Sequence, residues 1–115
     1  MKRLSDVRLK TQERKAINAF SRRVKAALGK QVISVLLFGS KARGKSNSDS
    51  DIDIYILVKK NTLGVGEKIA EITAAILNEY EILLSPVSYD LNEERKNLEL
   101  GSFFFEAVKK EGISI

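Results

Sequence analysis

The chain has no cysteine, histidine or tryptophan, and Pro86 is its only proline. Without cysteine it can form neither a disulfide nor a thiolate metal site. Without histidine it has no Ser-His-Asp triad and no histidine-bound zinc. Any catalysis must therefore use carboxylates, lysines, arginines, hydroxyl groups or a bound metal ion.

The chain also lacks a long hydrophobic run. No apolar stretch approaches the roughly 20 residues that a membrane span needs, and no apolar segment follows the charged first residues as it would in a signal peptide. We therefore expect a cytoplasmic protein with no membrane partner. A length of 115 residues with 43% hydrophobic content predicts one domain over residues 1–115.

Positive charge is concentrated at the start of the chain. Residues 1–30 carry a net charge of +8 and residues 31–115 a net charge of −3, which together give the +5 of the whole chain. A basic helix there could contact nucleic acid or an acidic partner, or it could be an ordinary solvated face. No aromatic residues interleave the basic positions, so we do not expect a nucleic-acid partner.

Helices and strands alternate in the predicted order of elements. Ile17, Phe20, Val24 and Leu28 follow helical spacing, which predicts a helix in the first 28 residues that begins near residue 6. The predicted strands are Val32–Phe38, Ile52–Val58 and Ile82–Ser88, and the later helices are Ser40–Lys45, Glu67–Tyr80, Leu91–Leu98 and Ser102–Lys110. Residues 46–50 are expected to form a polar loop and residues 59–66 a connector. This order predicts an α/β (α+β) fold with helices packed on a small sheet.

The third predicted strand contains Pro86. Proline has no N–H to donate to a neighbouring strand. We therefore expect this strand to lie at an edge of the sheet or to carry a bulge.

A Gly-Ser pair follows the first predicted strand. Gly39 has no Cβ, so the backbone can bend sharply there and an anion can approach it closely. Ser40 would offer a hydroxyl and a backbone N–H at the start of a helix, where the dipole favours negative charge. By itself this pattern is also typical of a plain strand-to-helix turn.

Two carboxylates stand at the start of the second predicted strand. Asp51 and Asp53 are two residues apart, so their side chains point to one face of the strand. Two carboxylates that converge without a cation repel each other, and a hard divalent cation such as Mg²⁺ relieves the repulsion. An anion site beside a metal site indicates nucleotide chemistry.

The motif Gly39-Ser40-Lys41-Ala42-Arg43-Gly44, followed after a spacer by Ser50-Asp51-Ile52-Asp53, closely resembles the nucleotidyltransferase motif of the DNA polymerase β superfamily. The match is to its smallest members, the minimal nucleotidyltransferase (MNT) domains of bacteria and archaea. Such domains are commonly partners of HEPN-domain proteins in toxin–antitoxin pairs. The resemblance implies a polymerase β palm-like fold with a mixed sheet of three or four strands.

The resemblance also implies roles for individual residues. Gly39 and Ser40 would hold the β- and γ-phosphates of a nucleoside triphosphate, with ATP as the expected substrate. Asp51 and Asp53 would bind Mg²⁺. Arg43 would either approach the phosphates or pair with a nearby carboxylate.

Further charged residues lie around this motif. Lys41 and Lys45 would either add positive potential around the triphosphate or be solvated on the surface of a helix. Asp49 would be a loop residue or an outer carboxylate near the metal.

The chain departs from the full catalytic pattern in one respect. Nucleotidyl transfer with two metal ions requires a third carboxylate on the next strand of the sheet, and the positions near Ser85 and Pro86 hold none. Asp90, past the predicted strand, is the candidate substitute, and its alternative role is to cap the helix that follows. Glu81, ahead of the strand, is a weaker candidate.

Two functions therefore stay open. The first is a Mg²⁺-dependent nucleotidyltransferase that moves AMP or another NMP onto a protein or small molecule, with a HEPN-domain protein as the natural partner. The second is a catalytically weak or inactive nucleotide-binding module that neutralises a partner by covering it. Because the short chain shows no second lobe, we expect a partner chain or a homodimer to complete the cleft.

Overall fold

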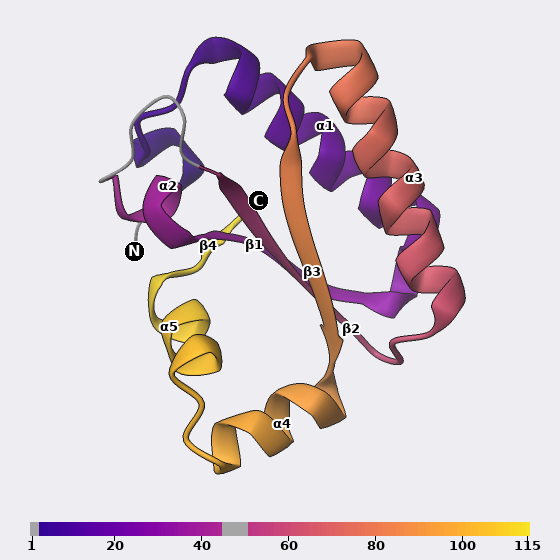
Figure 1. The fold of residues 1–115 in the computed structure, drawn as a ribbon, viewed down its shortest axis with the longest axis vertical. Coiled ribbons are helices and arrows are strands. Elements are labelled where there is room, and N and C mark those ends of the chain that lie inside the picture. Colours follow the sequence, from indigo (N-terminus) through magenta and orange to yellow (C-terminus); the bar gives the residue numbers. More distant parts are fainter. Residues whose placement is uncertain (1–2, 45–50) are drawn as a thin grey trace.

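The computed structural model describes residues 3–44 and 51–115. One four-stranded mixed sheet lies at its centre, in the order β3-β2-β1-β4 (Figure 1). The strands are β1 (Val32–Phe38), β2 (Ile52–Val58), β3 (Leu84–Asp90) and β4 (Ile113–Ser114). The helices are α1 (Thr11–Leu28), α2 (Gly39–Arg43), α3 (Leu63–Tyr80), α4 (Leu91–Glu99) and α5 (Phe103–Glu111), with short 3-10 turns at Leu4–Asp6 and Gly29–Gln31. The predicted α/β (α+β) fold with a small mixed sheet is confirmed.

Each face of the sheet has its own core. β2 is buried along nearly its whole length because helices cover both of its faces. Its even-numbered residues pack under α1 and α3 in the larger core, which contains Ile17, Phe20 and Ile76. Its odd-numbered residues Tyr55 and Leu57 pack against α5 on the opposite face. Asp53 has the same parity, so it lies on the α5 face of the sheet.

The strand directions follow from the lengths of the connections. β1 and β2 are antiparallel, whereas β3 returns parallel to β2 through the crossover helix α3. A parallel connection needs such a helix because the chain must return to the end of the sheet at which the previous strand began. β3 forms an edge of the sheet, which is one of the two arrangements that Pro86 predicted.

Several predicted boundaries are wrong. α1 begins at Thr11 and not near residue 6, because Arg14 donates hydrogen bonds to the carbonyl oxygens of Leu4 and Val7 and holds the preceding segment in a non-helical course. α3 begins at Leu63, four residues earlier than predicted, because Thr62 caps it by accepting a hydrogen bond from the Val65 backbone N–H.

Other differences concern the two outer strands of the sheet and the helix α2. β3 runs from Leu84 to Asp90, two residues later than predicted. The two-residue strand β4 was not predicted. α2 ends at Arg43 with Gly44 as its left-handed cap, so it is shorter than predicted. The polar loop predicted for residues 46–50 lies outside the described residues.

Candidate functional site

The Gly-Ser turn and the Asp pair come together at one end of the sheet. β1 ends at Phe38, whose Cα partner in β2 is Asp53. Because the strands are antiparallel, the residue after β1 meets the start of β2. Figure 1 shows α2 at this end of the sheet, beside the start of β2. The structure therefore brings Gly39 and Ser40 next to Asp51 and Asp53.

The closest approach at the site is between Gly39 and Asp53. Gly39 has a φ angle of +78°, and a Cβ placed on it would overlap the carboxylate of Asp53. Glycine is therefore required here for two reasons, its left-handed backbone and the space that the carboxylate occupies. The turn that follows β1 therefore lies against the side chain of Asp53.

The two carboxylates differ in their surroundings. Asp51 is exposed, whereas Asp53 is partly buried. Burial and the negative charge of Asp51 raise the pKa of Asp53, and the positive charge of Arg43 partly offsets the rise. A carboxylate with too little positive charge nearby is suited to binding a cation, and oxygen ligands suit Mg²⁺.

Among the described residues, no group of three or more acidic side chains could hold a metal ion. Ser85 lies directly beside Asp53 in the register of β2 and β3, so it occupies the place where a third carboxylate was expected. The donor set thus fits one cation held by two carboxylates and leaves a second metal ion without a ligand from β3.

Asp90 does not join this site. It aligns with Val58, five residues along β2 from Asp53, which is about 16 Å at the rise of a strand. Its side chain accepts hydrogen bonds from the backbone N–H groups of Glu93 and Asn61, so it caps α4. These bonds lower the pKa of Asp90. The position of Asp90 therefore does not support the role of third carboxylate. The alternative role, to cap the helix that follows, is the one observed.

Arg43 and Lys41 point to different surroundings. Arg43 is exposed and donates a hydrogen bond of 3.0 Å to Glu111 in α5, so it pairs with a carboxylate, the second of its two expected roles. Lys41 is buried and pairs with Glu13 in α1 at 2.8 Å. The expectation that Lys41 is solvated is therefore wrong. Lys45 and Asp49 lie outside the described residues.

Glu13 and Glu111 were not identified from the sequence. Both lie far along the chain from the motif residues they bind, and both sit in helices rich in charge. No spacing rule relates such positions. Only the packing of α1 and α5 around α2 shows the contacts.

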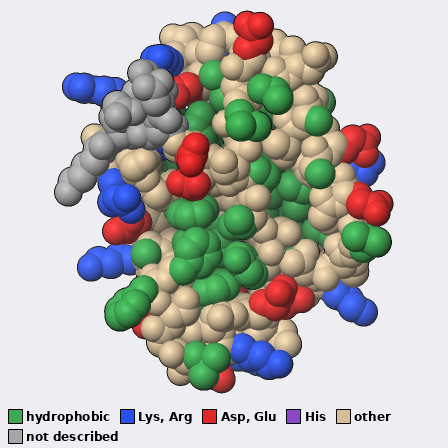
Figure 2. Space-filling view, viewed as in Figure 1, with side chains coloured by type: hydrophobic (Ala, Val, Ile, Leu, Met, Phe, Trp, Pro, Cys, Tyr) green, Lys and Arg blue, Asp and Glu red, His purple; other side chains and the backbone are tan. Residues whose placement is uncertain are grey.

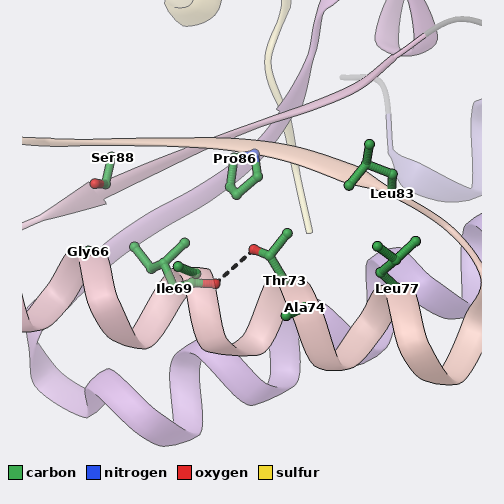
Figure 3. Close-up of a pocket in the computed structure, with 9 residues that line it drawn as sticks. Gly66, Ile69, Thr73, Ala74, Leu77, Leu83, Pro86 and Ser88 are labelled. Carbon is green, nitrogen blue, oxygen red and sulfur yellow. Dashed lines mark hydrogen bonds between the residues drawn. The ribbon is translucent and has the colours of Figure 1, made fainter.

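Two other features of the surface are apolar. Hydrophobic side chains gather on the face shown in Figure 2. Phe104 of α5 is 39% exposed and packs against Phe38, the register partner of Asp53. The other feature is a hollow of about 480 Å³ between α3 and β3 (Figure 3). It is lined mainly by apolar residues such as Ile69, Leu77 and Pro86, and its Thr73 hydroxyl is bound to the carbonyl oxygen of Ile69. No acidic side chain stands among the described residues that line this hollow.

Comparison with known proteins agrees with the site. The family model described as "Polymerase beta, Nucleotidyltransferase" matches residues 22–111. This match spans the Gly-Ser turn, the Asp pair and every strand except β4. The chain therefore belongs to the polymerase β nucleotidyltransferase family, as one of its minimal nucleotidyltransferase domains.

Individual relatives are consistent with this assignment. "Putative protein adenylyltransferase MJ0141" of Methanocaldococcus jannaschii is 33% identical over 100 residues, which are 86% of this chain and 94% of that protein. A solved structure of a minimal nucleotidyltransferase is 26% identical with a TM-score of 0.55, over 87% of this chain and 95% of the other. A chain of the toxin–antitoxin complex MntA–HpeT shares the fold, with a TM-score of 0.54 and 19% identity over 94% of this chain and 72% of that one.

The part of the chain that the structure describes has no helix long and apolar enough to cross a membrane.

Proposed function

We propose that the chain is a Mg²⁺-dependent nucleotidyltransferase that transfers AMP from ATP to a protein or small-molecule acceptor. The observation that carries this proposal is the close approach of Gly39 to the carboxylate of Asp53, which supports a phosphate-binding role for the Gly39-Ser40 turn beside the two aspartates. The similarity to a protein named as an adenylyltransferase supports ATP as the nucleotide.

The chain's own groups have distinct tasks in this reaction. The Gly39-Ser40 turn would hold the β- and γ-phosphates, and the Ser40 side chain is accessible because it is only partly buried. Asp51 and Asp53 would hold Mg²⁺, which would supply positive charge to offset the negative charge of the triphosphate. The narrow space between Gly39 and Asp53 would bring these groups within reach of the same triphosphate.

The reaction is a substitution at the α-phosphorus. An acceptor oxygen forms a bond to this phosphorus, the bond to the oxygen that bridges the α- and β-phosphorus atoms breaks, and pyrophosphate leaves. The acceptor's proton must pass to a base. Because Asp51 and Asp53 are assigned to the metal ion and Ser85 stands beside Asp53 on β3, we assign this proton to solvent water.

A protein partner is part of the proposal. The acceptor we propose is a HEPN-domain protein, as the family resemblance implies, with this chain as the antitoxin. The fold shared with a chain of a toxin–antitoxin complex is consistent with a protein partner. A partner chain or a second copy would also supply the wall of the cleft that one small sheet does not provide.

The second candidate function is a nucleotide-binding module with little or no turnover. One observation favours it, which is that Ser85 and not an acidic residue lies beside Asp53 on β3. Such a protein would bind nucleotide and neutralise its partner by covering it.

A transfer assay separates the two candidates. ATP labelled at the α-phosphate and Mg²⁺ are incubated with the protein, with and without its co-purifying partner, beside the Asp51→Ala/Asp53→Ala double variant. Label that appears on protein and is lost in the variant is the expected result. ATP binding without any transfer would replace the enzyme proposal with the binding module.

A further inference from the structure

α2 is too short to determine its own direction. It has five residues, and no side chain of the described residues caps its first turn with a hydrogen bond. A single helical turn is unstable in isolation because nucleation costs more than one turn recovers. The orientation of Ser40 must therefore depend on tertiary contacts of α2.

One side of α2 is anchored in the larger core. Ala42 is 2% exposed and packs in that core with Val7 and residues of α1. Its neighbour Lys41 is 3% exposed and donates a hydrogen bond of 2.8 Å to Oε2 of Glu13. Ser40 and Arg43 remain partly or largely accessible, so α2 has an anchored side and an accessible side.

Glu13 joins two elements through its two carboxylate oxygens. Oε2 binds the ammonium group of Lys41, and Oε1 accepts a hydrogen bond of 2.9 Å from the backbone N–H of Lys10 at the start of α1. Burial raises the pKa of Glu13, but the bonds from Lys41 and Lys10 lower it by more, so it lies below its ordinary value. The carboxylate is therefore charged at neutral pH and tied to both helices.

A buried ion pair contributes little to stability compared with well-packed apolar side chains of the same volume. Its distinctive property is direction, because an ammonium group and a carboxylate bond well in few geometries. An apolar pair at the same place would anchor α2 but would allow it to slide or rotate. This difference gives the ion pair a role that packing alone does not fill.

We propose that Glu13, through Lys41, is a positioning residue that orients the Gly39-Ser40 turn for the triphosphate. The proposal deepens the proposed function and rests on it. Lys41 then acts from behind the phosphate site and not as a phosphate ligand. Since misplacement of a binding group by about 1 Å can reduce rates roughly a hundredfold, loss of this pair is expected to weaken triphosphate binding about tenfold.

The experiment compares three variants with the wild-type protein. Glu13→Gln removes the charge and keeps the shape of the side chain. Glu13→Leu combined with Lys41→Met replaces the pair by apolar groups of similar size. Glu71→Gln is the matched control, because Glu71 forms an exposed pair with Lys68 at 3.5 Å in α3, away from the turn.

Three quantities are measured for each variant: the Tm, the Kd for MgATP and the amide hydrogen exchange of α2 relative to β1 and β2. Glu13→Gln is expected to raise the exchange rate in α2 about tenfold while the strands change less than twofold, and to raise the Kd about tenfold. The apolar double variant is expected to recover the Tm but neither the Kd nor the protection of α2. Glu71→Gln is expected to leave all three unchanged.

Either of two results would overturn the proposal. One is unchanged exchange of α2 in Glu13→Gln, and the other is a double variant that recovers both the protection of α2 and the Kd. Absence of MgATP binding by the wild-type protein would count against the proposed function instead. In that case the exchange data alone would still decide whether Glu13 orients α2.

Discussion

At the scale of single residues, the site depends on a glycine pressed against an aspartate. Gly39 combines a left-handed φ of +78° with a position where a side chain would overlap the Asp53 carboxylate. Gly44, five residues on, has a φ of +73°, but a Cβ added there would meet no described atom within 4 Å. A comparison of alanine substitutions at Gly39 and Gly44 therefore distinguishes the effect of backbone strain, present at both, from steric overlap, present only at Gly39.

Gly39→Ala is expected to lower the free energy of unfolding by about 2–3 kcal/mol and to abolish nucleotide transfer, because both strain and overlap push Asp53 away from the turn. Gly44→Ala carries the strain alone and is expected to lower it by about 1 kcal/mol. Urea unfolding and the transfer assay measure both effects. Equal losses in the two variants would show that the Gly39–Asp53 contact is unimportant.

At the scale of elements, the register of β3 decides which acidic residue can reach the site. The strand is parallel to β2, so β3 begins at the end of the sheet that holds the site and finishes at the other end of the strands. Asp90 ends the strand and caps α4 by accepting a hydrogen bond of 2.9 Å from the Glu93 backbone N–H. This capping role makes a different prediction from a catalytic one.

Asp90→Ala is expected to lower the Tm by about 5 °C through loss of the cap and to leave MgATP binding unchanged. The pKa of Asp90 is lower in the folded protein than in the unfolded chain. Its stabilising effect is therefore present above about pH 4, the ordinary value for aspartate, and is lost as the pH falls further. Thermal melts of both proteins from pH 7 to pH 3 test this, and a Tm difference that grows on acidification would contradict it.

At the scale of the whole molecule, metal binding is linked to folding. Any ligand that binds only the folded state raises the free energy of unfolding, by about 2.7 kcal/mol at a hundred times its Kd. Burial, and after it the negative charge of Asp51, raise the pKa of Asp53 in the absence of a cation, so its charged form is disfavoured there. The metal-free protein therefore carries a penalty that Mg²⁺ would remove.

Asp53→Asn is expected to leave the Tm of the metal-free protein equal or slightly higher, because one of two repelling charges is removed. Addition of Mg²⁺ with ATP is expected to raise the Tm of the wild-type protein by several degrees and that of the variant by less than about 1 °C. Differential scanning fluorimetry measures both. An equal rise in the two proteins would remove Asp53 from the metal site.

Much of the fold could be predicted from local patterns. The apolar runs Val32–Phe38 and Ile52–Val58 have the predicted bounds of β1 and β2. β2 is hydrophobic almost throughout because both of its faces are covered, whereas β1 buries only Val35 and Leu37 completely. Of the two possibilities that Pro86 indicated, an edge strand or a bulge, the edge strand is confirmed. The predicted start of α1 was wrong because the hydrogen bonds of Arg14 to the preceding segment are tertiary contacts that no local pattern encodes.

The sequence by itself determined the two central strands, and its motif of a Gly-Ser turn followed by two aspartates determined the family, because apolar runs and motif spacing are local in the chain. Only the tertiary structure decided that Ser85 lies beside Asp53 and that Lys41 is buried against Glu13. Both facts depend on strand register and helix packing, which bring together residues from distant parts of the chain. The cap that Asp90 forms on the helix directly after it is local, but the register of β3, which places Asp90 beside Val58, is what keeps it away from the site. The sequence pattern thus defines the groups that the site contains, and the packing defines which of them can act together.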